Sequence, residues 1–199
     1  MIFSPLIDDL IMAFRCLPGV GPKTAQRMAF YILQTEREGG NNLATSLKKA
    51  LQQVSKCQRC RTLSETPVCR ICSSTTRDNQ LLCVIENPVD ILAIEQTKEY
   101  NGLYFVLLGR LSPLDGISPE DLGVAEYRTL LQQGNIKEVI MATNLTVEGE
   151  TTAFYFAELT KEYGVKTSRI AQGVPFGGEL ESIDSGTLAR ALGDRDLIY

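Results

Sequence analysis

Two pairs of cysteines in the first half of the chain constrain its fold more than any other feature. Cys57 and Cys60 are separated by two residues, as are Cys69 and Cys72, and eight residues lie between the pairs. This spacing lets two thiolate pairs hold one tetrahedral Zn²⁺. The sequence contains no histidine, so the ligands must all be thiolates. Four thiolates leave no open coordination position, and we therefore expect a structural zinc site and not a catalytic one.

Disulfides are the alternative for these cysteines. The apolar start of the chain, residues 1–14, carries Asp8 and Asp9 with no basic residue before them, which is unlike a secretory signal. The chain also has no apolar run of roughly 18 residues that could span a membrane. We therefore expect a cytoplasmic protein whose thiols stay reduced. The segment Lys56–Thr75 has no helical or strand periodicity, so loss of the metal should loosen it and leave the rest folded.

Charge divides the sequence at Arg77. Residues 1–77 hold 11 Lys and Arg against 5 Asp and Glu, a net charge of +6, whereas residues 78–199 hold 9 against 19, a net charge of −10. A basic first part favours contact with phosphate, and an acidic second part favours a cation or a basic partner. Chance segregation of solvated charge is the alternative. Four cations flank the cysteines and are expected to offset the charge of the metal site and to extend the phosphate-binding face: Lys56, Arg59, Arg61 and Arg70.

The first part of the chain predicts three helices. Ser4 and Pro5 are typical of a helix start, and apolar residues then recur at helical spacing as far as Leu17. A second helix is expected from Pro22, and a third over Asn42–Val54, with residues 39–41 separating the two. We expect Cys16 to be buried in the first helix.

A glycine hairpin joins the first two helices. Gly19 and Gly21 permit a turn that is too tight for a Cβ, and they leave backbone N–H groups free at the start of the second helix. Those donors form an anion site, which Lys23 and Arg27 would flank. Such a site contacts phosphate and reads no bases, so it predicts sequence-independent DNA binding. A simple helix–helix turn that needs glycine is the alternative. Residues 17–25 resemble the helix-hairpin-helix motif of DNA repair and replication proteins.

Short apolar runs alternate with helical stretches after Arg77, which predicts a small parallel α/β sheet. The expected strands are Leu81–Ile85, which contains a buried Cys83, Tyr104–Leu108, Val139–Ala142 and Val165–Ile170. The expected helices are Val89–Gln96, Gly123–Gln133 and Thr151–Tyr163.

Three carboxylates follow these strands. Glu86 ends the first strand, and Glu148 and Glu150 come after the third. Because the carboxyl ends of parallel strands face one crevice, the three side chains are expected to converge there, and converging carboxylates often bind Mg²⁺. A face that docks a partner protein, or a solvated acidic rim, is the alternative.

The motifs occur in an order that resembles the RecR family of bacterial recombination proteins over essentially all 199 residues. The segments that carry the resemblance are LPGVGPKTAQRMAF, CQRC with CRIC, LLCVIENPVDILAIE, LLGRLSPLDGISPEDLG, ATNLTVEGETTA and PFGGELESIDSGTLARAL. The resemblance implies an α+β protein of several parts. These are a helix-hairpin-helix domain (residues 1–55), a four-cysteine zinc finger (56–76), an α/β Toprim domain with a small parallel sheet (77–174) and a C-terminal assembly region (175–199).

The resemblance also implies a non-enzymatic function. A RecR-like protein would be a ring-shaped homo-oligomeric clamp, a dimer or tetramer, that binds DNA and works with RecO and RecF to load RecA onto gapped or single-stranded DNA, without a membrane. The alternative is an Mg²⁺-dependent Toprim enzyme that acts on phosphodiesters, with Glu86 as acid or base and with Glu148 and Glu150 as metal ligands. Toprim enzymes have Asp-x-Asp at the latter positions, and the chain shows no evident placement of a nucleophilic tyrosine. Both features favour the non-enzymatic role.

Overall fold

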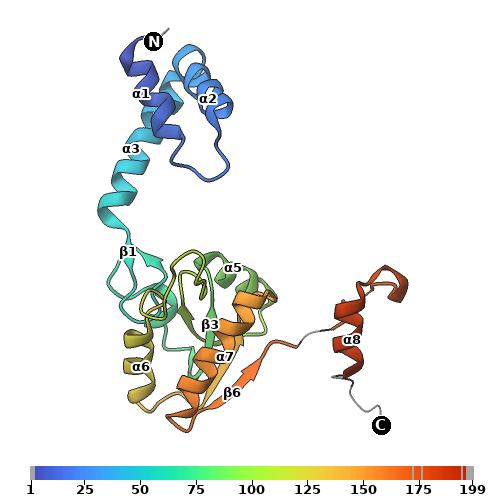
Figure 1. Ribbon diagram of the computed structural model, residues 1–199. Coiled ribbons are helices and arrows are strands. Elements are labelled where there is room, and N and C mark those ends of the chain that lie inside the picture. The colour runs from blue at the N-terminus through green and yellow to red at the C-terminus, as the bar shows by residue number, and fades with distance from the viewer. Residues whose placement is uncertain (1–2, 172, 176, 194, 196–199) are drawn as a thin grey trace. The chain divides into compact units, whose positions relative to one another are not determined.

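The chain forms two compact units, Met1–Ser55 and Lys56–Tyr199. The structure is a computed structural model that describes residues 3–171, 173–175, 177–193 and 195. The first unit is helical. The second holds a parallel sheet and the C-terminal segment (Figure 1), and it also contains the four clustered cysteines. This α+β architecture confirms the predicted fold class.

Three helices form the first unit: α1 (Pro5–Phe14), α2 (Pro22–Gln34) and α3 (Arg37–Gln53). Proline occupies the start of α1 and of α2, as predicted. The prediction that residues 39–41 separate two helices is wrong, because they lie in the first turns of α3. The Glu36 side chain caps this helix by accepting a hydrogen bond from Gly39 N at 3.2 Å. Gly40 allows close packing, since a Cβ there would lie 2.5 Å from Ile32 Cγ2.

The helical unit has a small core. Ala25 and Ala29 of α2 are its buried residues among those described, and the Phe3 and Phe30 rings meet edge to face at 5.0 Å. Large apolar side chains on all three helices remain exposed, including Leu6, Met12, Leu43, Leu47 and Leu51. The Cys16 thiol is exposed as well, against the prediction, because α1 ends at Phe14 and leaves Cys16 in the following turn. This unit therefore retains much apolar surface that its own chain does not cover.

The cysteine-rich segment contains three short elements. Strands β1 (Ser55–Lys56) and β2 (Leu63–Ser64) pair with each other, and a single helical turn, α4 (Arg70–Ser73), follows. Elements this short show no periodicity in sequence, which explains why none was predicted. Local hydrogen bonds and the cysteine cluster hold them.

Four parallel strands form the sheet of the second unit: β3 (Asp78–Ile85), β4 (Gly102–Val106), β5 (Glu138–Ala142) and β6 (Lys166–Arg169). Their order is β4-β3-β5-β6, so β4 and β6 are the edge strands. The connecting helices are α5 (Pro88–Thr97), α6 (Val124–Gln132) and α7 (Val147–Lys161). All seven elements confirm the predicted ones. Helix α7 begins four residues earlier than expected because Thr146 caps it, accepting a hydrogen bond from Gly149 N at 3.1 Å.

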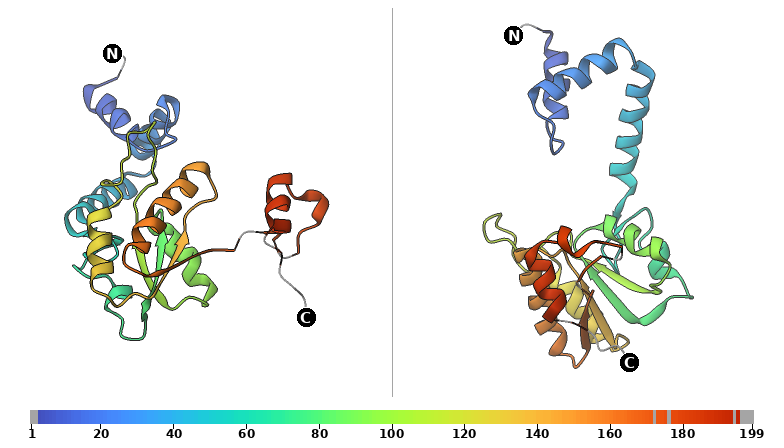
Figure 2. Two further views of the ribbon diagram at one scale, coloured as in Figure 1. Left: turned by 60° about the horizontal axis from the view of Figure 1, so that its bottom comes forward. Right: turned by 90° about the vertical axis from the view of Figure 1, so that its right-hand side faces the viewer.

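The sheet lies between two helical layers, with α7 and α5 on opposite faces (Figure 2). Alternate side chains of each strand serve the two faces, as the pleat requires. Leu82 and Phe105 pack under α6 and α7, where Tyr127 and Phe156 complete a larger core. On the other face, Cys83 is buried with the apolar side of α5, which confirms its predicted burial.

The C-terminal segment contains a short 3₁₀ turn, η1 (Leu180–Ser182), and helix α8 (Ser185–Gly193). Residues 176, 194 and 196–199 of the predicted assembly region (175–199) lie outside the described residues. Of those that are described, none is buried. Across the described residues, no helix combines the length and apolarity that crossing a membrane demands.

Candidate metal centre and nucleic-acid interface

The four predicted cysteines come together at one point of the second unit. All four are buried, and their sulfur atoms lie within 4.8 Å of one another. Cys57 and Cys60 occupy the turn after β1, while Cys69 precedes α4 and Cys72 lies within it. All are free thiols, so the disulfide alternative does not apply to this structure.

Backbone hydrogen bonds shape the two turns that present these thiols. Arg61 N donates to Cys57 O at 2.9 Å in the first turn, and Ser73 N donates to Cys69 O at 3.0 Å in the second. Cys69 N also donates to the Cys57 sulfur at 3.3 Å. Each turn thus places two sulfurs on one side, which is how a two-residue spacing becomes a pair of ligands.

The electrostatics of the cluster call for a cation. Burial alone would raise the pKa of Cys57, but neighbouring backbone N–H groups outweigh burial and lower this pKa to about 7. Hydrogen bonding to the Cys72 side chain, together with burial, holds the pKa of Cys60 far above its usual value. Burial raises the pKa of Cys69 to about 11. A divalent cation would favour the thiolate form at all four sites, so the donor set fits zinc.

The glycine hairpin lies between α1 and α2, as predicted. Val20 N donates to Leu17 O at 3.2 Å, and Gly19 has a φ of +77°, a left-handed conformation that favours glycine. Gly21 behaves differently from the expectation. Its φ is −80°, and a Cβ built on it would meet no atom within 4 Å. The turn itself therefore requires glycine at Gly19, whereas Gly21 leaves the start of α2 open to an approaching molecule.

The start of α2 has the features of an anion site. No side chain caps it, and its first turn contains no acidic residue, so the positive end of the helix dipole is uncompensated. Lys23 and Arg27 are exposed on this helix, and within the described residues neither joins an ion pair. Ala25 and Ala29 face inward from the same helix.

Glu86 is engaged within the fold. Only 2% of it is exposed, and its carboxylate accepts hydrogen bonds from Asn144 N at 2.8 Å and from Asn144 Nδ2 at 2.7 Å. Gly149 allows this arrangement, because a Cβ on Gly149 would press on both the Asn144 carbonyl and the Glu86 carboxylate. Sequence reasoning missed Asn144 as the partner of Glu86. Its position two residues before the capping Thr146 was the available signal.

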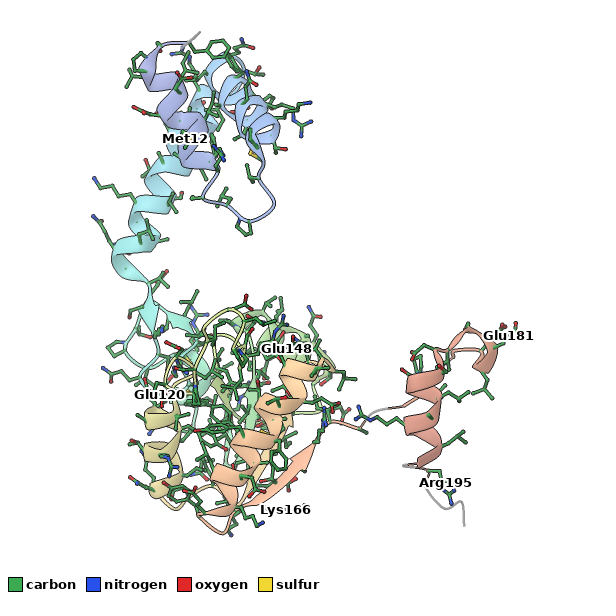
Figure 3. All side chains as sticks on the ribbon, viewed as in Figure 1. Met12, Glu120, Glu148, Lys166, Glu181 and Arg195 are labelled. Atoms are coloured by element: carbon green, nitrogen blue, oxygen red, sulfur yellow. The ribbon has the colours of Figure 1, made fainter. Side chains whose placement is uncertain are left out.

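The other two carboxylates do not join Glu86. Glu150 pairs with Arg190 at 2.7 Å and with Arg169 at 3.1 Å, and the hydrogen bond from Arg190 leads the effects that lower the Glu150 pKa. Glu148 lies in the first turn of α7 (Figure 3). Through the described residues, the cysteines are the only group of three or more potential ligands whose donor atoms lie close together. The expected convergence of three carboxylates is therefore absent there, and this acidic set does not fit an Mg²⁺ site.

The cations around the cysteines also differ from the expectation. Arg61 is buried, so it cannot extend a phosphate-binding surface. Arg59 donates to Cys72 O at 2.8 Å and thereby braces the second turn of the cluster. Lys56 and Arg70 remain exposed.

Family comparisons cover almost the whole chain. Residues 7–51 match the RecR helix-hairpin-helix family, residues 54–74 the RecR four-cysteine zinc finger domain, residues 80–171 the Toprim domain and residues 173–195 the RecR C-terminal family. The zinc finger match includes all four clustered cysteines. The buried thiols and this match together assign a structural zinc. The metal would link the two cysteine turns of a segment that has little hydrophobic core of its own.

Curated relatives are similar over nearly their full length. The Recombination protein RecR of Saccharophagus degradans is 53% identical over 197 residues, which are 99% of this chain and 100% of the relative. The Recombination protein RecR of Xanthomonas oryzae pv. oryzae is 55% identical over 192 residues, 96% of this chain and 98% of the relative. That of Xylella fastidiosa is 55% identical over 190 residues, 96% of each chain.

We predict that the purified protein contains about one zinc ion per chain. Replacing Cys60 with Ser removes one of the four ligands, so zinc content should fall well below one and amides of residues 56–75 should exchange faster. Elemental analysis and hydrogen exchange measure these effects. Cys16→Ser is the control, because Cys16 is exposed in the other unit and its loss should leave zinc bound. A metal-free, fully functional protein with two disulfides in this segment would contradict the assignment.

Proposed function

Because the chain belongs to the RecR family of recombination proteins, we propose that it acts as a DNA-binding clamp and recombination mediator in DNA repair. The observation that carries the proposal is the open start of α2, where an uncapped helix end, Lys23 and Arg27 occur together beside the Gly19 turn. Backbone N–H groups and two cations suit a phosphate of the nucleic acid backbone.

The DNA contact is sequence-independent in this proposal. Gly19, Gly21, Lys23 and Arg27 offer main-chain donors and flexible cations, and none of these reads a base edge. Gly21 contributes because it has no side chain, and the open space at its Cβ position admits a sugar–phosphate backbone close to the helix. A binder of this kind suits gapped or single-stranded DNA of any sequence, onto which RecA is to be loaded.

Clamp function requires more than one copy of the chain, and we propose a ring-shaped dimer or tetramer. A groove of about 570 Å³ in the helical unit supports this proposal. Its lining is mainly apolar and comes from all three helices, with Leu10, Phe14, Leu17, Ile32, Leu33 and Leu47 among the contributors. Burying such a surface against a second copy would stabilise both copies. Segment 173–195, whose described residues are all at least partly exposed, is proposed as a second assembly surface.

We propose that the acidic part of the chain, residues 78–199, recruits RecO and RecF. Residues 78–199 carry a net charge of −10, from 9 basic and 19 acidic residues, which would repel DNA and attract a basic protein surface. Glu148 is the preferred contact among the three carboxylates. Glu86 is buried against Asn144, and Glu150 is paired with two arginines.

The same carboxylates support a non-enzymatic role for the Toprim domain. A metal-dependent phosphodiester enzyme needs carboxylate oxygens that are free to hold the ion. The Glu86 and Glu150 oxygens already accept hydrogen bonds from Asn144 and from arginines. A DNA cleavage experiment can distinguish this non-enzymatic role from the alternative, an Mg²⁺-dependent enzyme.

We predict that the double variant Lys23→Ala, Arg27→Ala binds DNA more weakly, and by the same factor for all sequences. The slope of log affinity against log salt concentration should become shallower by about one to two units. The reason is that each lost phosphate contact removes about one released counterion. Fluorescence anisotropy over a salt series measures this effect. Lys48→Ala with Lys49→Ala is the matched control, since it removes the same charge from α3 of the same unit. If the α2 variant binds DNA at low salt as tightly as the wild type, the hairpin is only a helix–helix turn and has no role in DNA binding.

The protein is expected to leave DNA intact with Mg²⁺ or Mn²⁺ present, since the Glu86 and Glu150 carboxylates are engaged within the fold. Incubation with nicked, gapped and supercoiled substrates, resolved on gels, tests this expectation. Metal-dependent cleavage that disappears in Glu86→Gln would establish the enzyme instead.

Glu148→Lys should slow association with RecO roughly tenfold at low salt, and less at moderate salt, because electrostatic steering is screened. Surface plasmon resonance at several ionic strengths gives the rates. The matched control is Glu158→Lys, which makes the same charge change on the exposed side of α7 ten residues further along. Equal rates for wild type and Glu148→Lys at every salt concentration would remove Glu148 from the proposed contact.

A further inference from the structure

Arg61 is a buried cation in an unusual backbone conformation. It follows the zinc ligand Cys60 directly, and only 6% of it is exposed. Its φ is +63°, in the left-handed region that residues with a Cβ rarely adopt. Such a conformation persists only where the surroundings impose it. The contacts of the Arg61 side chain show what imposes it.

The Arg61 guanidinium holds the two ends of a long loop of the Toprim domain. Its Nη1 donates to the carbonyls of Leu107, at 3.3 Å, and of Leu122, and its Nη2 donates to Asp121 O at 3.1 Å. The guanidinium also lies 5.6 Å from the centre of the Phe105 ring. The three carbonyl partners lie 46 to 61 residues away in sequence. Arg61 thus joins the end of β4 to the residues that precede α6.

Gly123 is shaped to fit this guanidinium. Its φ is +79°, and a Cβ built on it would overlap the Arg61 side chain. Gly134 provides a useful comparison, because its φ is +72° but a Cβ there would meet no atom within 4 Å. Both glycines carry the same backbone requirement. Only Gly123 also makes room for Arg61.

The backbone of the zinc finger is joined to the same part of the sheet. Cys60 O accepts a hydrogen bond from Val106 N at 2.9 Å. Because β4 is an edge strand, this N–H points away from its neighbour β3 and would otherwise lack a partner in the sheet. The carbonyl of a zinc ligand therefore completes the edge of β4, and the next side chain along the chain holds the loop.

We propose that Arg61 couples the zinc finger to the loop formed by residues 107–123, so that the metal centre positions this loop. Zinc holds the Cys57–Cys60 turn, the turn holds Arg61 in its left-handed conformation, and Arg61 fixes both ends of the loop. The middle of the loop forms a closed turn, in which Ile117 N donates to Ser112 O at 2.9 Å, and this turn presents Leu114 with 98% of its surface exposed. Arg61 is a positioning residue in this scheme, and coupling must act in both directions.

The test compares Gly123→Ala with Gly134→Ala in the full-length protein loaded with zinc. Both variants place a Cβ on a left-handed residue, but only the first displaces Arg61. Competition with a chromogenic zinc chelator measures retention of the metal. We expect Gly123→Ala to weaken zinc binding about 10- to 100-fold, the range found when a group that supports a metal ligand is lost. Gly134→Ala should stay within about twofold of wild type, because it leaves the support of the ligands unchanged. Wild-type retention in Gly123→Ala, or equal losses in both variants, would overturn the proposal.

A second measurement uses the wild-type protein, so its outcome does not depend on whether a variant folds. Zinc is removed from the wild-type protein, and hydrogen exchange is followed in the loop (107–123) and in the far strands β5 and β6. Coupling through Arg61 predicts faster exchange in the loop, with β5 and β6 unchanged. Exchange in the loop that stays the same after zinc removal would overturn the proposal, as would equal acceleration throughout the sheet.

Discussion

Four thiols crowded within 4.8 Å are tolerable as thiolates only around a cation, and much of the second unit depends on meeting that requirement. The zinc finger is too short to build a core, so the metal supplies its cross-link. Once folded, the finger covers the outer edge of β4 through Cys60 and reaches the sheet through Arg61. An exposed strand edge is a template for unwanted pairing, and the hydrogen bond from Val106 N to Cys60 O occupies one donor of that edge.

The Toprim domain uses acidic residues as structural groups. Glu86 orders the loop after β5 by accepting two hydrogen bonds from Asn144, and Glu150 brings together arginines from β6 and α8. In both cases the carboxylate oxygens that a divalent ion would need are already engaged in hydrogen bonds or ion pairs. Exposed ion pairs such as those of Glu150 contribute about 1 kcal/mol or less, so the buried Glu86 interaction matters more to the fold.

The helical unit, by contrast, buries few of its own side chains. Its described buried residues are two alanines, and a groove of about 570 Å³ remains open among its apolar side chains. A unit with so small a core gains stability from association. The exposed cations Lys23 and Arg27 and the uncapped start of α2 lie in the same unit as this groove.

The sequence alone determined whatever depends on local pattern: the cysteine spacing, the proline starts of α1 and α2, and the alternation of four strands with three helices. It also allowed the family to be recognised, because motif order is a property of the sequence. Only the tertiary structure decided which polar groups are consumed by distant partners. Arg61 looked like a surface cation and Glu86 like a metal ligand, yet carbonyls of Leu107, Asp121 and Leu122 engage the first and Asn144 engages the second. The physical reason is that a buried charge must find hydrogen-bonding partners, and those partners are set by chain topology and not by neighbouring residues.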